Sequence, residues 1–385
     1  MKLTSPGPTL GIVGGGQLGR MIGEAAAPLG IEVIVSDPTP DPPAAPTVRD
    51  TLVGDFDDPE AMRELARRAD VLTFEIELAD PDVLDDVREE FDIPVHPTPD
   101  TLRVIQDKFV QNTRLADHGV PVPDFKAVAD ADELREACEE FGYPAMVKAR
   151  EGGYDGRGNL PVESADHAAE VLDEVGGDAL VEEMVEFVRE ISVIAVKGTD
   201  EVATYTAGEN VHEEEILRET VVPARASDAV LARAHDVAES VLEILEGRGV
   251  YGIELFETAD GEILVNEIAP RPHNSGHWTI EGAVTSQFEQ HARAVVGLPL
   301  GSTELRCPTV SANILGDVAE PERAALSGVE TALAEPGVSL HWYGKREVRP
   351  LRKMGHLTLI GNENEAGDDL LAHIRTIRDH LTFTQ

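Results

Sequence analysis

The chain has 385 residues, of which 73 are acidic and 32 are basic, so its formal net charge is −41. This length predicts two or three domains with sizeable cores. The charge argues against a nucleic-acid partner, because binding to phosphates needs a basic surface. Only seven of the basic residues are lysines. Such a composition is typical of salt-accumulating halophiles, and we expect the stability of the fold to depend on salt.

Two features favour a cytoplasmic protein over a secreted or membrane protein. The first residues lack the apolar stretch of a signal peptide, and no run in the chain approaches 18 apolar residues. Cys138 and Cys307 are too few for a disulfide framework or a thiolate metal site.

Residues 1–99 alternate between predicted strands and helices, which indicates a doubly wound parallel α/β domain of the Rossmann-like type. Prolines at 97 and 99 interrupt the pattern and mark its end. The expected strands are 9–14, 31–37, 71–77 and 93–97, and the expected helices are 17–30, 59–69 and 81–91.

The pattern changes between residues 100 and 297, where we expect a second α/β domain, and residues 298–385 are predicted to form a small α+β domain. Within the second domain a hairpin turns near residue 260. The other expected elements are helices around Lys108 and at 131–142, 228–246 and 286–297, and strands at 144–150, 179–185 and 189–198.

Two glutamates lie on either side of the hairpin turn. The Asp-Gly pair at 260–261 is a strong signal for a two-residue turn. This turn places Ala259 opposite Glu262 and, further along, Glu254 opposite Glu267. Facing carboxylates repel each other, and Mg²⁺ relieves that repulsion because it prefers oxygen ligands. A chance pairing is the alternative in so acidic a chain.

The segment from Gly14 to Gly19 satisfies G-x-G-x-x-G between a predicted strand and a predicted helix, with Asp37 at the end of the next strand. This pattern resembles the dinucleotide fingerprint, in which a helix N-terminus binds a phosphate. The motif is weak alone, so an NAD-dependent oxidoreductase is only one alternative.

A second glycine cluster, EGGYDGRGN at 151–159, follows Lys148 at the end of a strand. Backbone amides of such a loop can cover phosphates, while the lysine supplies positive charge. The spacing is not that of a Walker P-loop, and a flexible hairpin tip is the alternative. In a chain with so few lysines, Lys108 and Lys148 are candidates for specific roles.

Two further clusters concentrate polar groups. Lys345 and Lys353 lie among arginines at 346, 349 and 352, which predicts either an anion site or a set of salt bridges. The segment after the hairpin predicts a fixed polar loop beside the metal, in which an arginine can grip a carboxylate or phosphate with two hydrogen bonds. Its residues are Arg271, His273, Asn274, Ser275 and His277.

These motifs together closely resemble the ATP-grasp superfamily and, within it, the N5-carboxyaminoimidazole ribonucleotide synthase family. The resemblance covers nearly the whole chain, and its most specific parts are GGYDGRGN and APRPHNSGHWT. It implies an α/β and α+β protein with a Rossmann-like pre-ATP-grasp domain, an ATP-grasp domain whose lid spans about residues 120–185, and a small C-terminal domain. It also implies a homodimer that hands its product to the N5-CAIR mutase.

The resemblance implies an ATP site made of phosphate-binding lysines, a covering loop, an adenine hinge, a ribose-binding glutamate and a histidine near the nucleotide. Glu254 and Glu267 match the Mg²⁺ ligands of the family. The implied ATP-binding residues are Lys108, Lys148, Gly153, Tyr154, Asp155, Gly156, Arg157, Gly158, Asn159, Glu182, Glu183, Met184, Val185, Glu190, His212, Asn266 and Glu267.

A second site for 5-aminoimidazole ribonucleotide (AIR) is implied against the first domain, with a basic pair for its 5′-phosphate. Arg271, His273 and Asn274 match a pocket for bicarbonate and carboxyphosphate, and Asp155 is the candidate that receives the amine proton. The implied AIR-binding residues are Gln17, Leu18, Glu75, Tyr154, Asp155, Arg157, Lys345 and Arg352.

The implied activity is a ligase of purine biosynthesis that carboxylates AIR with bicarbonate and ATP, through carboxyphosphate, and releases ADP and phosphate. The alternatives are another ATP-grasp enzyme, such as a formate-dependent glycinamide ribonucleotide transformylase, or a non-catalytic nucleotide-binding regulatory subunit.

Overall fold

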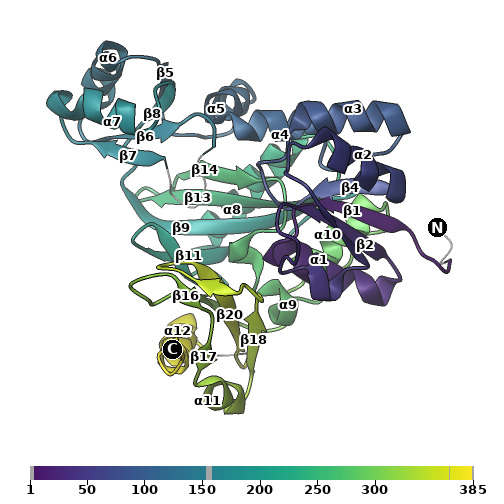
Figure 1. The fold of residues 1–385 in the computed structure, drawn as a ribbon. Coiled ribbons are helices and arrows are strands. Elements are labelled where there is room, and N and C mark those ends of the chain that lie inside the picture. The colour runs from purple at the N-terminus through teal and green to yellow at the C-terminus, as the bar shows by residue number, and fades with distance from the viewer. Residues whose placement is uncertain (1–3, 153–157, 364, 384–385) are drawn as a thin grey trace.

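The computed structural model describes residues 4–152, 158–363 and 365–383 (Figure 1). It begins with a parallel sheet in the order β3-β2-β1-β4. The strands are β1 (Thr9–Val13), β2 (Glu32–Asp37), β3 (Asp50–Val53) and β4 (Val71–Phe74). The expected strand at 93–97 is wrong, since only a single bridge joins Val95 to Leu72. Pro94 and Pro97 lack the N–H groups that a ladder needs. Strand β3 was not predicted because its side chains are exposed or half-buried.

Helices cover both faces of this first sheet, as the alternation of elements predicts. On one face lie α2 (Pro59–Arg68) and α3 (Pro81–Phe91), which each begin with an aspartate cap followed by proline. On the other face lie α1 (Gln17–Ala26) and α10 (Gln287–Val295). Because α10 comes from the central part of the chain, the first sheet shares a core with that part.

The largest sheet has nine strands, in the order β14-β13-β9-β11-β12-β15-β20-β18, with β10 paired to β9. The ladders within it are antiparallel. Its strands are β9 (Phe187–Lys197), β10 (Val202–Thr204), β11 (Gly208–Glu213), β12 (Ile216–Val222), β13 (Gly249–Thr258), β14 (Ile263–Ala269), β15 (Thr309–Leu315), β18 (Val338–Trp342) and β20 (Lys353–Ile360).

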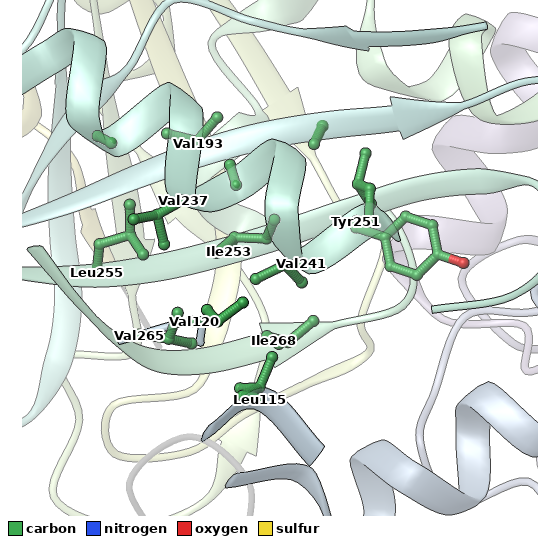
Figure 2. Packing of buried hydrophobic residues seen from close by; sticks show 14 of the residues in the cluster. Leu115, Val120, Val193, Val237, Val241, Tyr251, Ile253, Leu255, Val265 and Ile268 are labelled. Carbon is green, nitrogen blue, oxygen red and sulfur yellow. The ribbon is translucent and has the colours of Figure 1, made fainter. Parts of the chain in front are cut away.

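Two helices cover one face of this central sheet. Helix α8 (Asp228–Ile244) packs Val237 and Val241 against Ile253 and Leu255 of β13, as Figure 2 shows. Helix α12 (Gly367–Arg378) covers the C-terminal strands of the same sheet. Side chains alternate along a strand, so the residues between the core positions of β13 point to the opposite face.

A second, four-stranded antiparallel sheet in the order β5-β8-β6-β7 forms a separate small core with two helices (Figure 1). Its elements fall within residues 120–185, for which a lid is predicted. Its elements are β5 (Phe125–Val128), α6 (Ala131–Phe141), β6 (Ala145–Ala149), β7 (Asn159–Val162), α7 (Ala168–Glu174) and β8 (Ala179–Glu183). Helix α5 (Lys108–Asp117) lies between this sheet and the rest of the molecule (Figure 1).

Candidate active site

The hairpin of β13 and β14 confirms the pairing of Glu254 with Glu267, but its turn differs from the expected one. Thr258 N donates to Glu262 O at 3.0 Å, and Gly261 N donates to Thr258 O at 2.9 Å. The loop therefore has three residues and ends on Gly261, whose φ is +76°, as in a turn followed by a glycine bulge. The predicted pairing of Ala259 with Glu262 is wrong by one residue.

A bulge at Asn266 restores the register that the turn displaces. Ile263, Val265 and Ile268 belong to the core under α8, so the spacing of core residues changes from two to three at this point. Without the extra residue, Glu267 would point into that core. The bulge instead turns Glu267 to the same face as Glu254.

The two carboxylates have opposite electrostatic surroundings. Burial, followed by the charge of Glu267, raises the pKa of Glu254. Burial would also raise the pKa of Glu267, but the positive charges of Lys108, His273 and Arg271 outweigh it and lower the pKa. Nearby cations thus stabilise the ionised form of Glu267, whereas burial and the neighbouring charge destabilise the ionised form of Glu254.

The residues present fit Mg²⁺ bound with a nucleotide. Glu254 and Glu267 offer carboxylate oxygens, and across the described residues no cluster of three or more His, Cys, Asp or Glu side chains could hold a metal by itself. Mg²⁺ is commonly held by one or two carboxylates together with substrate phosphates. An all-protein cage is therefore not required here.

Lys148 connects the four-stranded sheet of β5 to β8 with the hairpin. It lies on β6, is 7% exposed, and its Nζ lies 2.7 Å from Glu182 Oε2 and 3.3 Å from Asn266 Oδ1. Glu182 in turn accepts from Asn112 Nδ2 at 2.9 Å. Three of the predicted ATP-binding residues, Lys148, Glu182 and Asn266, therefore lie in contact.

Lys108 begins α5 beside the base of the covering loop. Its N–H donates to Arg150 O at 2.9 Å, and Arg150 forms an ion pair with Asp107, the residue that caps α5. This arrangement places the charge of Lys108 near Glu267.

The other residues predicted for the adenine hinge and for ribose binding follow one another from the end of β8 into β9. Glu183 ends β8, and Met184 and Val185 lead directly into β9. On β9, Glu190 lies 2.9 Å from Nδ1 of His212 on β11. Burial would lower the pKa of His212, but the hydrogen bond and charge of Glu190 raise it.

Five residues of the covering loop, Gly153, Tyr154, Asp155, Gly156 and Arg157, lie outside the described residues, so their assigned roles stay predictions. Gly158 and Asn159 follow, and Gly158 O accepts from Ala149 N at 2.8 Å.

The polar loop after the hairpin is held against the site. Arg271 Nε lies 2.8 Å from Glu77 Oε1. His273 Nδ1 contacts Ser275 Oγ at 2.8 Å and lies 3.8 Å from Glu254 Oε1. A Cβ at position 252 would lie 2.3 Å from that of His273, so glycine there makes room for the histidine.

Asn274 has a distinctive position in this loop. Its Nδ2 is buried and finds no hydrogen-bond partner among the described residues. A buried donor without a partner is costly. A small anion held by Arg271 and His273 would satisfy it.

The G-x-G-x-x-G turn is occupied by the chain's own carboxylates. Glu75 accepts hydrogen bonds from the N–H groups of Gly16 and Gly19, and Asp37 Oδ2 accepts from Gly15 N at 2.9 Å. These amides are the donors that a dinucleotide phosphate would need. The structure therefore gives no support to the NAD alternative. Burial raises the pKa of Glu75, against the effect of these amides.

The other predicted AIR residues are spread over two domains. Gln17 begins α1, and Leu18 is 6% exposed within the core. Lys345 Nζ donates to Lys353 O at 2.7 Å, and Arg352 Nη1 donates to Glu347 O at 2.7 Å.

The structure adds residues that sequence reasoning missed. Asn210 Nδ2 donates to Glu254 Oε1 at 3.0 Å, Glu77 pairs with Arg271, and Gln287 holds the backbone of His273 through two hydrogen bonds. Lys353 lies close enough for its charge to act on Glu254. Two of these residues lie in segments that offered a signal: Asn210 lies in ENVHEEEIL, and Lys353 lies in the basic cluster, which predicts an anion site but not a neighbour of Glu254.

Three family models match consecutive parts of the chain. They are the ribonucleotide synthetase preATP-grasp domain over residues 8–106, the ATP-grasp domain over 113–288 and the phosphoribosylaminoimidazole carboxylase C-terminal domain over 309–369. The order confirms the expected fold class.

Known proteins match this chain over nearly its whole length. The N5-carboxyaminoimidazole ribonucleotide synthase of Brucella melitensis is 41% identical, and the match covers 92% of this chain and 97% of the relative. The phosphoribosylaminoimidazole carboxylase of Candida albicans is 40% identical over 95% of this chain, which spans 66% of that longer relative.

Solved structures of the same family superpose on nearly the whole chain. The N5-carboxyaminoimidazole ribonucleotide synthetase of Thermotoga maritima superposes with a TM-score of 0.88 at 41% identity, covering 98% of this chain and 99% of that one. The Aspergillus clavatus synthase in complex with ADP and AIR gives 0.89 at 36% identity, covering 98% and 99%. The chain therefore belongs to the N5-carboxyaminoimidazole ribonucleotide synthase family of the ATP-grasp superfamily.

Proposed function

We propose that this protein is the ATP-dependent ligase that carboxylates AIR with bicarbonate, giving N5-carboxyaminoimidazole ribonucleotide, ADP and phosphate in purine biosynthesis. One observation carries the proposal. The facing pair Glu254 and Glu267 lies between the lysine-bearing lid and the loop that carries Arg271, His273 and Asn274. A nucleotide phosphate and a small anion would meet there.

The chemistry begins with an attack of a bicarbonate oxygen on the γ-phosphorus of ATP, which breaks the bond to ADP and forms carboxyphosphate. Lys108, Lys148 and Arg271 offset the negative charge that gathers at the γ-phosphate. Mg²⁺ held by Glu254 and Glu267 would neutralise phosphate charge when bound. The donor Nδ2 of Asn274 would orient the bicarbonate.

The second step transfers the carboxyl group. The exocyclic amine of AIR attacks the carboxyl carbon of carboxyphosphate, or the CO₂ released from it, phosphate leaves, and the amine loses a proton. Asp155 is the proposed acceptor of that proton. Water must be excluded while carboxyphosphate exists, which is the role we assign to the loop at 153–159. Lys345 and Arg352 would hold the 5′-phosphate of AIR, together with contacts from Gln17, Leu18 and Glu75.

The proposal extends to the setting of the reaction. We infer a cytoplasmic homodimer that works without nucleic acid or membrane and passes its product to a mutase. Along the described residues, no helix is long and apolar enough to cross a membrane.

The decisive experiment measures ADP release from ATP by the purified protein in high salt with Mg²⁺. We expect release to require both AIR and bicarbonate. Equal release with formate and glycinamide ribonucleotide would support the transformylase instead, and nucleotide binding without any turnover would support a regulatory subunit.

A variant of the bicarbonate loop sharpens this test. Arg271→Lys keeps the positive charge but removes the planar fork that grips an oxyanion. We expect it to raise the KM for bicarbonate by about tenfold with little change in the KM for ATP. Arg293→Lys, which alters an arginine that forms an ion pair with Glu289 of its own helix, is the control and should leave both constants unchanged.

A further inference from the structure

Asn210 connects the metal-binding face of the central sheet to two strands that carry no ligand. It lies on β11, is 5% exposed, and its Nδ2 donates to Glu254 Oε1 at 3.0 Å. Strand β9 lies between β11 and β13, and its residue opposite Glu254 is Ser192. The small serine side chain leaves room for the asparagine to reach across β9.

Two hydroxyl groups fix the orientation of the amide. Ser192 Oγ and Thr220 Oγ1 donate to Asn210 Oδ1 at 3.1 and 3.2 Å. An ionised carboxylate can only accept hydrogen bonds, so the amide nitrogen must face Glu254. None of the four residues is more than 9% exposed, so water competes little for these bonds.

The two polar neighbours of Glu254 approach the same oxygen of its carboxylate. Asn210 and His273 both approach Oε1 of Glu254, so Oε2 is the oxygen that can face a metal ion. An amide orients the carboxylate without neutralising it, whereas an arginine would compete with the cation. Outer residues that orient metal ligands commonly affect metal affinity by about 10- to 100-fold.

We propose that Asn210 is a positioning residue, which holds the Glu254 carboxylate in the orientation that binds the divalent cation of the nucleotide. The inference rests on the proposed function for the identity of the site, but it concerns cation binding, which can be measured without turnover.

The test uses Mn²⁺ as the probe, titrated into the full-length protein with a non-hydrolysable ATP analogue and followed by electron paramagnetic resonance. We expect Asn210→Ala to weaken Mn²⁺ binding by about 10-fold or more. In steady-state assays the half-saturating Mg²⁺ concentration should rise, while the KM for AIR stays within about twofold of its original value.

Asn313→Ala is the matched control. Asn313 is 6% exposed on β15 of the same sheet, and its Nδ2 donates to Leu217 O at 2.8 Å, away from the two glutamates. This variant should lose stability in the way that Asn210→Ala does, because both lose a buried hydrogen bond, yet its Mn²⁺ affinity should be unchanged.

Unaltered Mn²⁺ affinity in a folded Asn210→Ala protein would overturn the proposal, and so would an equal loss in both variants. If Asn210→Ala does not fold, Thr220→Val decides, because it keeps the amide but removes one of its two hydroxyl donors. It should weaken Mn²⁺ binding in the same direction but less, and an unchanged affinity would overturn the inference. A wild-type protein that binds Mn²⁺ with nucleotide but never turns over AIR would refute the proposed function alone.

Discussion

The two faces of the central sheet both bury carboxylates, but they compensate the buried charge in different ways. On the face under α8 and α12, Glu209, Glu219 and Glu257 each form an ion pair with at least one arginine. On the opposite face, Glu254 lies against Glu267 and accepts a hydrogen bond from an uncharged amide. Strand β13 carries both kinds of glutamate, with Glu257 on the first face and Glu254 on the second.

The difference distinguishes structural acids from ligand-binding acids. A buried carboxylate paired with arginine is already neutralised, and breaking such a pair is strongly destabilising. A buried carboxylate that faces another carboxylate costs stability, and such a cost is typical of functional sites. Composition alone cannot make this distinction in a chain with 73 acidic residues.

The largest effect that we expect is on activity, from Glu254→Gln. This change removes one charge of the facing pair and should lower the rate of ADP release by about 100-fold or more. The free energy of unfolding without metal should stay the same or rise, because a repulsion between buried charges disappears. Chemical unfolding and the ADP assay measure the two quantities. A large loss of stability would show that Glu254 is a structural acid.

Glu219→Gln, on the face under α8 and α12, should instead lower stability and leave activity unchanged. Glu219 is 1% exposed and accepts from Arg375 at 2.9 Å and from Arg378 at 2.6 Å. Removing its charge leaves two arginines without their partner and should cost about 3–5 kcal/mol of unfolding free energy. Activity per folded molecule should be retained, and a selective loss of activity would break the comparison.

Most of the fold was predictable because the longer helices bury an apolar stripe and the first domain alternates strand with helix. The pairing of Glu254 with Glu267 was also predicted, although the turn from which it was predicted differs from the observed one. The expected turn was one residue too short, and the bulge at Asn266 compensates for it. A bulge has no simple sequence signal, because it reflects which side chains the core under α8 accepts.

The rest of the site depends on contacts between distant segments. Asn210 is 44 residues from Glu254, and Glu77 meets Arg271 from another domain. Neither partner can be chosen from one sequence in which acids are so abundant. The occupation of the glycine turn by Glu75 is a similar case, since the motif shows which amides are available but not which carboxylate reaches them.

The buried His291 and the half-buried His96 show a third way to accommodate titratable groups, namely without charge. Burial lowers the pKa of His96 to about 4 and that of His291 to about 3. His291 Nδ1 accepts from Val250 N at 3.1 Å, and its Nε2 contacts Thr73 Oγ1 at 2.9 Å. The neutral ring is therefore fully hydrogen-bonded.

Stability should consequently fall as the pH is lowered. The unfolded chain binds protons at these histidines near pH 6.5, whereas the folded chain does so only near their lower pKa values. Each histidine should then reduce the unfolding free energy by about 1.4 kcal/mol per pH unit between pH 6 and pH 4. Urea unfolding of wild type and His291→Gln across this range checks the effect, and identical slopes would contradict it.

The smallest expected effect is that of salt on the stability difference between wild type and Glu219→Gln. The net charge of −41 makes exposed acids repel one another, and added salt screens exposed charges much more than buried pairs. The unfolding free energy of wild type should therefore rise with salt, while the gap between wild type and Glu219→Gln should change by less than about 1 kcal/mol. Urea unfolding at low and molar salt gives both values. If the difference in unfolding free energy between wild type and Glu219→Gln disappears in high salt, the arginine pairs of Glu219 behave as surface pairs. The two faces of the sheet would then differ in exposure, and not in how their buried charges are compensated.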